Sequence, residues 1–347
     1  IYTLGGATSD FTSMGQFLKT LEKCGIDGKV TLNILPGTYS ESINFRQLAG
    51  MFTTYDTLII TSSTGDTSDV VFTGGVSLDN VQNIVISNIT FDLSSGSETG
   101  VNFASACDNI EINGCNSKLN PTATGTSTCG IRYNGSSTTP IMGNIRILNN
   151  SFTGGGTGIY MYYTHPNSTA MTTSNKYITI INNTFNNLGQ YGMYSYYYNK
   201  YDSIAYNVFN MRTTSTTQYG CYMYYYNRID GGFFNNKITL NASSTCYGFY
   251  DYYLNVAATG AQHNAPIFNN EIRRLNSGTF YGIYVYYSNL DVMNNTVYSQ
   301  GSGTCYNIYS SYANATYFSN VKGNISYTAT TGTGYPLYIS SASYAAG

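Results

Sequence analysis

The segment Ile178–Phe185 has the sequence ITIINNTF, and the tripeptide Gly192-Met193-Tyr194 follows it. Both patterns recur along the chain. Copies of the first are Ile84–Phe91, Ile145–Phe152, Ile204–Phe209, Phe233–Ile238, Ile267–Ile272 and Val292–Val297, and copies of the second are Gly158-Ile159-Tyr160, Gly220-Cys221-Tyr222, Gly248-Phe249-Tyr250 and Gly282-Ile283-Tyr284. Matching positions recur every roughly 25 to 34 residues, which is the length of one solenoid coil. The repeat therefore predicts stacked coils and not a sandwich.

Within each copy, apolar and polar residues alternate over about five positions, as in a strand with one face inside a narrow tube and the other in water. At the following turn, asparagine tolerates left-handed backbone angles, and its amide bonds to the same amide one coil away, at the strand spacing of about 4.8 Å. We therefore expect a ladder made of Asn149, Asn182, Asn235, Asn269 and Asn294. The sequence predicts an all-β fold, a single right-handed parallel β-helix.

A helical pattern precedes the repeat. Its apolar residues are Phe11, Met14, Phe17, Leu18 and Leu21, with Ser9 or Asp10 as the candidate cap and Gly25 as the stop. We expect a short N-terminal capping helix over about residues 11–23, with no other helix, that covers the open end of the tube. Residues 1–50 are expected to form this cap and the first coil, in which Val30–Leu35 and Ile43–Phe45 flank a turn at 36–39. Residues 51–347 are expected to continue the coils of the same single domain.

Charge is scarce in this chain. Only 9% of the residues are charged, so solubility depends on amides and hydroxyls. The net charge of -2 gives no basic footprint for nucleic acid and no attraction to an anionic membrane surface. Without an apolar run of about 18 residues, no membrane span is expected. Because no signal peptide opens the chain, we expect a mature or excised segment of a secreted or cell-surface protein.

The seven cysteines are spread without CxxC pairs, so neither a zinc site nor a dense disulfide framework is indicated. Cys221, Cys246 and Cys305 lie within or near copies of the tyrosine-rich motif, and we expect them to stack on successive coils as buried thiols. A disulfide between Cys107 and Cys129 is the alternative. The two histidines are isolated from each other, so we expect no metal site and no cofactor.

The opening residues resemble a known group. Tyr2–Gly6, Asp10-Phe11, Val30–Ile34 and Leu35–Glu41 are similar to the first coil of pectin-esterase-like β-helix proteins, most closely the large secreted surface proteins of Bacteroidetes bacteria. The pairing of IINNTF with GMY resembles the right-handed β-helix repeat of NosD-like and polysaccharide-processing proteins. The resemblance covers nearly the whole chain and implies the fold. It says little about function, because this scaffold carries lyases, hydrolases, esterases and adhesins.

Enzymes of this fold that act on polysaccharides need concentrated charge, either paired carboxylates or a calcium-binding acidic cluster with a base. In the repeat region the aspartates occur singly, and the family motifs Asp-Asp, Gly-His-Gly, Arg-Ile-Lys and Gln-Asp-Thr-Leu are absent from the sequence. Asp251 is the first catalytic candidate because its sister positions are mostly apolar, as at Met161 and Val285. A locally wet strand face is its structural alternative. Arg273 and Asp230 are weaker candidates for the catalytic site of a polysaccharide lyase or hydrolase.

Tyrosines give a stronger signal. The alternation that directs Ile159, Met193 and Cys221 inward directs tyrosines outward. The predicted binding face consists of Tyr160, Tyr162, Tyr194, Tyr196, Tyr222, Tyr224, Tyr250, Tyr252, Tyr284 and Tyr286. Two such columns would offer rigid contact area with hydrogen-bonding tips. The alternatives are that stacking only stabilises the solenoid, that a loop covers the face, or that a reversed register places the rings in the core.

The leading hypothesis is a non-catalytic extracellular module, an adhesin or surface-fibre segment. Its face of Tyr, Asn and Thr residues would bind a glycan or a protein partner at the cell surface, including other copies of itself in a fibre. The second hypothesis is the lyase or hydrolase with an active site assembled across coils. The third is a stiff structural rod without a ligand.

Overall fold

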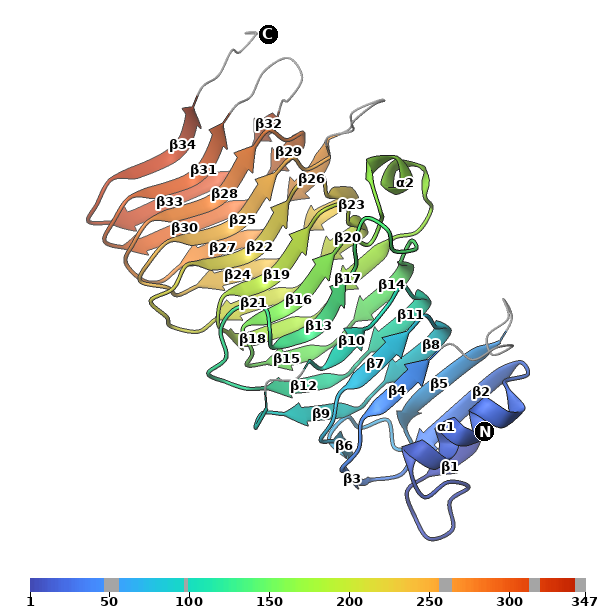
Figure 1. Ribbon diagram of the computed structural model, residues 1–347. Helices are drawn as coiled ribbons and strands as arrows, with labels where there is room; N and C mark the ends of the chain where they lie inside the picture. The colour runs from blue at the N-terminus through green and yellow to red at the C-terminus, as the bar shows by residue number, and fades with distance from the viewer. Residues whose placement is uncertain (47–55, 97–98, 256–263, 312–318, 341–347) are drawn as a thin grey trace.

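The chain is a parallel β-helix. A computed structural model describes residues 1–46, 56–96, 99–255, 264–311 and 319–340. Over these residues the strands form three parallel sheets, with 12 strands in sheet A and 11 in each of sheets B and C. The chain passes from A to B to C and returns to A one coil further on, so each sheet gains one strand per coil (Figure 1). The predicted all-β solenoid with an N-terminal helix is confirmed.

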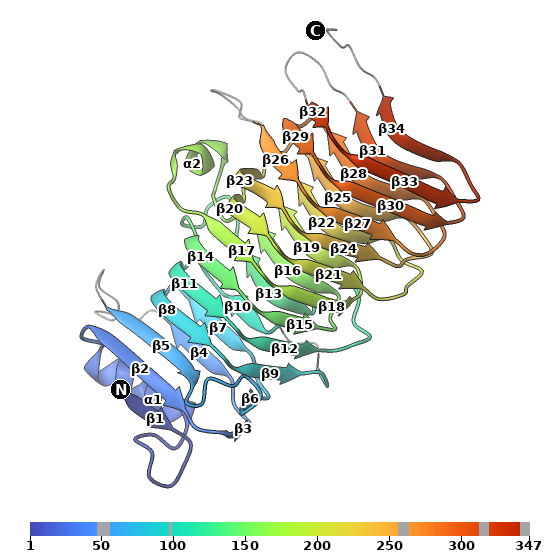
Figure 2. The same cartoon turned by 180° about the vertical axis from the view of Figure 1, so that it is seen from behind.

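The strands of each sheet follow one another along the solenoid, and β1 and β34 lie at its opposite ends (Figure 2). Sheet A contains β1 (Tyr2–Leu4), β2 (Lys29–Ile34), β5 (Thr57–Ser62), β8 (Gln82–Ser87), β11 (Asp108–Asn113), β14 (Gly143–Leu148), β17 (Ile178–Ile181), β20 (Lys200–Ala205), β23 (Arg228–Phe234), β26 (Ala265–Phe268), β29 (Leu290–Met293) and β32 (Ser319–Lys322). Sheet B contains β3 (Gly37–Tyr39), β6 (Val70–Phe72), β9 (Thr90–Leu93), β12 (Asn116–Leu119), β15 (Ser151–Thr153), β18 (Thr184–Leu188), β21 (Val208–Met211), β24 (Lys237–Leu240), β27 (Glu271–Arg274), β30 (Thr296–Gly301) and β33 (Ile325–Thr330). Sheet C contains β4 (Ile43–Arg46), β7 (Val76–Asp79), β10 (Val101–Phe103), β13 (Cys129–Asn134), β16 (Thr157–Tyr162), β19 (Tyr191–Tyr196), β22 (Gln218–Tyr224), β25 (Cys246–Tyr252), β28 (Phe280–Tyr286), β31 (Cys305–Ser311) and β34 (Gly334–Ser340).

The interior of the tube is filled by like side chains stacked in register. Ile145 of sheet A pairs with Ile178 one coil on, and both are fully buried. In sheet B, Phe152, Phe185 and Phe209 follow one another, with ring centroids 4.9 and 4.7 Å apart. Burial of each such side chain stabilises the fold by about 1.5–3 kcal/mol. Because every coil buries its inner face against its neighbours, the stability accumulates along the axis.

The continuous asparagine ladder is displaced by one residue from the predicted one. The predicted residues take left-handed backbone angles, φ 57° at Asn149 and 58° at Asn182, and these two amides are bonded at 2.7 Å. The buried ladder is formed by the next residue of each turn, with amide-to-amide bonds of 2.9–3.1 Å between coils. It comprises Asn150, Asn183, Asn207, Asn236, Asn270, Asn295 and Asn324.

Each buried asparagine joins three coils. The amide nitrogen of Asn236 donates to the carbonyl of Ile204 on the preceding coil at 2.8 Å and to Oδ1 of Asn270 on the following coil at 3.1 Å. Its own Oδ1 accepts from the backbone and side-chain nitrogens of Asn207, both at 3.0 Å. The pair of asparagines therefore divides two tasks, since the first makes the turn and the second satisfies the buried polar groups.

The glycine of each Gly-x-Tyr motif lies where sheet C approaches sheet B. A Cβ atom on Gly192 would lie 2.3 Å from the carbonyl oxygen of Gly220 and 2.6 Å from the Phe209 ring. At Gly220 it would lie 2.4 Å from a methyl group of Ile238. Only glycine permits this approach, so the recurring glycine is a packing requirement of the coil.

Two details of the predicted helical content are wrong. Helix α1 spans Met14–Cys24 and begins three residues later than predicted, because Ser13 is the N-cap and accepts a hydrogen bond from Gln16. Phe11 is buried but forms an isolated bridge with Leu4. A second helix, α2 (Ser168–Thr173), was not expected, and the side chain of Asn167 caps it. Among the described residues, no helix is long and apolar enough to span a membrane.

The first coil and the cysteines also differ in part. The expected turn at 36–39 contains strand β3, so this coil already supplies all three sheets. All seven cysteines are free, and only Cys24 is exposed, so the alternative disulfide is not formed. Cys246 and Cys305 share an interior column with Phe280 between them, whereas Cys221 pairs with Phe249 in another column. The predicted stack of three thiols is therefore wrong.

The ladder gives a direct test of this architecture. Replacing Asn236 with Ala should lower the free energy of unfolding by about 2–4 kcal/mol, because buried donors of Asn207 lose their acceptor. Asn235→Ala is the matched control at the adjacent turn position, where φ is 54°, and should cost about 1 kcal/mol through backbone strain. Chemical denaturation measures both values. Equal losses would contradict the assignment of the ladder to the second asparagine.

Candidate functional site

The three catalytic candidates lie on three different sheets. Asp251 belongs to β25 of sheet C, Arg273 to β27 of sheet B and Asp230 to β23 of sheet A. Arg273 forms an ion pair with Glu271 of its own strand. Asp230 forms an ion pair with Arg228, with 2.5 Å between Oδ1 and the guanidinium Nε. The structure does not bring the candidates together.

Asp251 points into the tube and is fully buried. Its Oδ1 accepts a hydrogen bond of 2.9 Å from the backbone nitrogen of Tyr286 on the next coil. Burial raises the pKa of Asp251 to about 8, against the opposing effect of hydrogen bonds from Tyr286 and Ser288. An acid without exposed surface cannot reach a polymer, so its perturbed pKa reflects the cost of its burial. In the described part of the chain, no three His, Cys, Asp or Glu residues are grouped so that they could hold a metal ion.

The tyrosines form ordered columns on the outer face of sheet C. All ten predicted residues lie on the outer face of sheet C, and Ile159, Met193 and Cys221 beside them are fully buried. The reversed register is therefore excluded. We number the columns of this face in the order in which each strand crosses them. The second column is Tyr160, Tyr194, Tyr222, Tyr250, Tyr284, Tyr309 and Tyr338, with consecutive ring centroids 4.9–5.2 Å apart. The third column is Tyr162, Tyr196, Tyr224, Tyr252 and Tyr286, at 4.8–5.4 Å.

Another full column was missed by the sequence analysis. The first column is Tyr191, Tyr219, Tyr247, Tyr281, Tyr306 and Tyr335, with centroids 4.9–5.1 Å apart. Its residues precede the second column by three positions, which strict alternation would direct inward. The alternation is broken because Gly220 and Cys221 are both buried, so Tyr219 and Tyr222 both face outward. The recurring Tyr-Gly-x-Tyr spacing was the available signal. We call these three columns the tyrosine face.

A further column lies on the turn that follows sheet C. It consists of Tyr163, Tyr197, Tyr225, Tyr253 and Tyr287, with φ between 50° and 60°. A bulky residue rarely adopts this conformation and does so only where its surroundings enforce it. Here the rings stack across coils, for example 5.1 Å apart for Tyr197 and Tyr225, and buried Asn199 bonds to Asn227 at 2.9 Å beneath them. A second, shorter asparagine ladder thus supports the edge of the tyrosine face.

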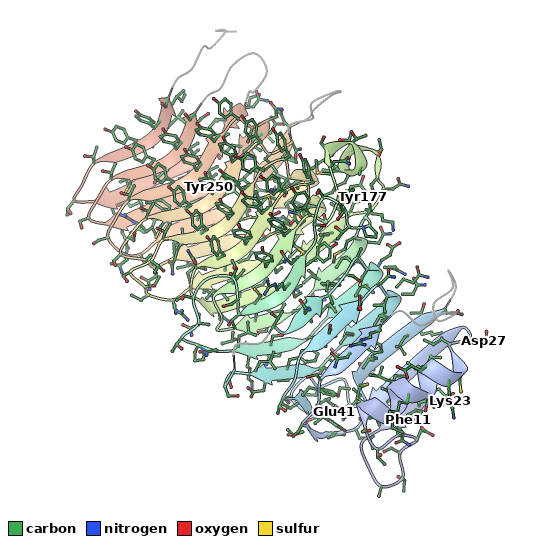
Figure 3. All side chains as sticks on the ribbon, in the orientation of Figure 1. Phe11, Lys23, Asp27, Glu41, Tyr177 and Tyr250 are labelled. Atoms are coloured by element: carbon green, nitrogen blue, oxygen red, sulfur yellow. The ribbon has the colours of Figure 1, made fainter. Side chains whose placement is uncertain are left out.

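The rings turn their faces toward one another and not toward solvent. Cross-coil neighbours are nearly parallel, with interplanar angles of 3° for Tyr250 and Tyr284 and 4° for Tyr219 and Tyr247. Each ring therefore covers the face of the next, and the ring edges and phenol oxygens remain outermost. Figure 3 shows this arrangement as rows of parallel rings over sheet C around Tyr250.

The tyrosine face is uncharged. In strands β16, β19, β22, β25, β28, β31 and β34 the sole charged residue is Asp251, which points inward. Burial among the other rings raises the pKa of Tyr219 and of Tyr247 to about 12. At neutral pH these two phenols keep their protons and can both donate and accept a hydrogen bond.

Toward the N-terminus the second column continues in polar residues. Asn44, Ser77, Asn102 and Arg132 occupy the same column on successive strands and lead to Tyr160. The guanidinium of Arg132 lies over the Tyr160 ring, 5.4 Å from its centroid, and so covers the ring face at the N-terminal end of the column. These four polar residues line an open groove of about 380 Å³. The outer surface of sheet C is therefore a shallow polar groove followed by the tyrosine face.

Comparisons with known proteins add little about activity. No protein-family model matches the sequence, and no curated protein matches it. A similar solved structure is described as a mannuronic acid specific polysaccharide family 6 lyase enzyme from human gut microbiota. The alignment has 12% identity and a TM-score of 0.35, and it covers 93% of this chain and 89% of the lyase. A match at this level supports no argument about function.

The buried acid predicts an unusual pH dependence. Between the unfolded pKa of about 4 and the folded pKa of about 8, the folded state holds a proton that the unfolded state releases. The free energy of unfolding should therefore fall as pH rises from 4 to 8, by an amount on the order of a few kcal/mol. Asp251→Asn should remove this fall and be more stable than the wild type at pH 7.

Urea denaturation at several pH values measures the effect, and Asp27→Asn at an exposed position is the control. If Asp251→Asn shows the same pH dependence as the wild type, the carboxyl is not the buried neutral group described here.

Proposed function

We propose that this chain is a non-catalytic extracellular module that binds carbohydrate through the tyrosine face. The observation that carries the proposal is the outward array of tyrosines, repeated in register on every coil from β19 to β31. Such a surface serves an extended ligand, because a compact ligand would need only one coil. An adhesin or a surface-fibre segment is the setting in which a rigid array of this kind is useful.

The chemistry of the face favours a glycan over other partners. Phenols in dense rows supply hydrogen-bond donors and acceptors without net charge, and sugar hydroxyls have the same character. Nucleic acids and anionic membranes require cationic surfaces, and the tyrosine face has no cation among its columns. A rod without a ligand would also explain the stacking, and the binding experiment separates these two functions.

The lyase or hydrolase hypothesis receives no support from the candidate residues. Asp251 has no exposed surface, and Arg273 and Asp230 lie on other sheets. We therefore expect no release of unsaturated or reducing ends from pectin, alginate or neutral glucans, as measured by absorbance and reducing-sugar assays. Turnover that disappears in Asp251→Asn would overturn the non-catalytic proposal.

Removing rings from the third column tests the binding role. Changing Tyr196, Tyr224 and Tyr252 together to Ser deletes the four stacking contacts within the third column. The free energy of unfolding should fall by about 2–4 kcal/mol, while the β-helix persists. Binding on a glycan array should be lost. The control is Tyr206→Ser in the turn after β20, where Tyr206 is 54% exposed.

A folded triple variant that retains wild-type glycan binding would show that the tyrosine face is only scaffold. A wild-type chain that binds no glycan would leave the structural rod as the better function.

A further inference from the structure

We propose, resting on the carbohydrate-binding function above, that the tyrosine face recognises the ordered, insoluble surface of an uncharged polysaccharide through its phenol hydroxyls. The polymer chains would run along the solenoid axis, one over each column. In this mode the ring faces take no part in recognition.

The stacking within the columns excludes the usual mode of sugar binding by aromatic residues. A pyranose that packs on a ring needs a free ring face. In the second column both faces of Tyr222 are covered, by Tyr194 at 5.1 Å and by Tyr250 at 5.0 Å. The N-terminal end of the column is covered by Arg132 over Tyr160. What remains for a ligand is the row of ring edges and hydroxyl groups.

These hydroxyl groups belong to an array with a regular repeat along the axis and a width of three columns. Along the axis, successive rings of the second column are 4.9–5.2 Å apart. Across the axis, rings of the second and third columns are parallel and 5.5–6.4 Å apart. Rings of the first column stand nearly perpendicular to those of the second, at 4.9–5.3 Å. The parallel sheet imposes this regularity, because each coil repeats the position of the last. An array that repeats regularly along the axis and is three columns wide matches a partner whose chains repeat along one direction and lie side by side.

An ordered solid is also the partner for which many weak contacts suffice. Each phenol contributes one modest hydrogen bond, and a flexible soluble chain would lose conformational entropy for every sugar that it aligned. In a crystalline polysaccharide the chains are already aligned, so the contacts add without that loss. Affinity should therefore depend on the order of the polymer and not only on its sugar.

The absence of charge in the columns selects an uncharged polymer. A polyuronate would bring one carboxylate per sugar to a surface whose strands β19, β22, β25 and β28 carry no cation. Arg132 lies beyond the first ring of the second column and supplies a cation at one end only. Acidic polysaccharides would thus meet no compensating charge along the columns.

A second copy of this chain fits the face less well. Protein interfaces gain most from burying aromatic rings, and here the rings have already buried one another. Contact between two such faces would join hydroxyl tips over little additional apolar area.

The experiment uses Tyr→Phe substitutions, which keep the rings and their stacking and remove only the hydroxyls. Tyr222, Tyr250 and Tyr284 are changed together to Phe, and Tyr206→Phe outside the face is the matched control. Binding isotherms are measured on microcrystalline cellulose and crystalline chitin, on their swollen amorphous forms, on the soluble hexasaccharides and on alginate. Thermal unfolding verifies that each variant is folded.

The wild type and Tyr206→Phe should bind at least one crystalline polymer more tightly than its amorphous form, and should bind alginate and the hexasaccharides weakly. The triple Phe variant should unfold like the wild type and bind the crystalline polymer roughly tenfold to several hundredfold more weakly. Undiminished binding by this variant would overturn recognition by hydroxyls. Equal affinity for soluble hexasaccharides would overturn the ordered-surface inference and leave the carbohydrate-binding function standing. If none of the polymers or sugars binds, or if sedimentation shows dimers that the triple variant abolishes, the proposed function fails as well.

Discussion

The fixed spacing of parallel coils, secured by the buried asparagine ladder, is the constraint on which the rest of the structure depends. Each ladder amide bonds to the coils before and after it, as Asn236 does with Ile204 and Asn270. A coil that moved out of register would leave several buried donors and acceptors without partners, at about 1–3 kcal/mol each. The inner rows of isoleucine and phenylalanine are compatible with small shifts, whereas the amide bonds are directional. The polar ladder therefore fixes the register that the apolar core only favours.

The spacing between coils also sets the spacing between side chains on the outer surface. Because the strands are about 4.8 Å apart, rings attached to them stack in parallel, and each ring face within a column is covered by the ring of the next coil. In β22 the glycine two positions before the second-column tyrosine extends the effect, because buried Gly220 and Cys221 let Tyr219 and Tyr222 both face outward. In β31 the buried Asn307 takes the place of this glycine. A repeat of one residue per coil thus becomes a two-dimensional array of hydroxyls. The interior accommodates an exception, the buried Asp251, whose burial cost is offset only in part by hydrogen bonds from the next coil, so that its pKa stays raised.

The sequence predicted the fold because the period of its repeat is a direct consequence of coil length, and it predicted the outward tyrosines because side chains alternate along a strand. It did not predict which asparagine of each pair is buried, since both residues suit a turn and only packing distinguishes Asn235 from Asn236. The Tyr191 column was missed because a glycine interrupts the alternation. Helix α2 lies in a single loop outside the repeat, where periodicity carries no information. Asp251 was recognised as exceptional, but the sequence could not show that it has no exposed surface.

The central claim is that binding belongs to the array and not to one local site. Removing residues 222–249 deletes one coil and joins Cys221 to Tyr250 in register, because Cys221 pairs with Phe249 and Tyr222 with Tyr250. Duplicating the same residues adds one coil. The account predicts that the deletion weakens binding to a crystalline neutral polysaccharide and that the duplication strengthens it. The two changes in binding free energy should be similar in size. An affinity that is unchanged by both, or abolished by the deletion and unaffected by the duplication, would place binding at a single site and contradict the account.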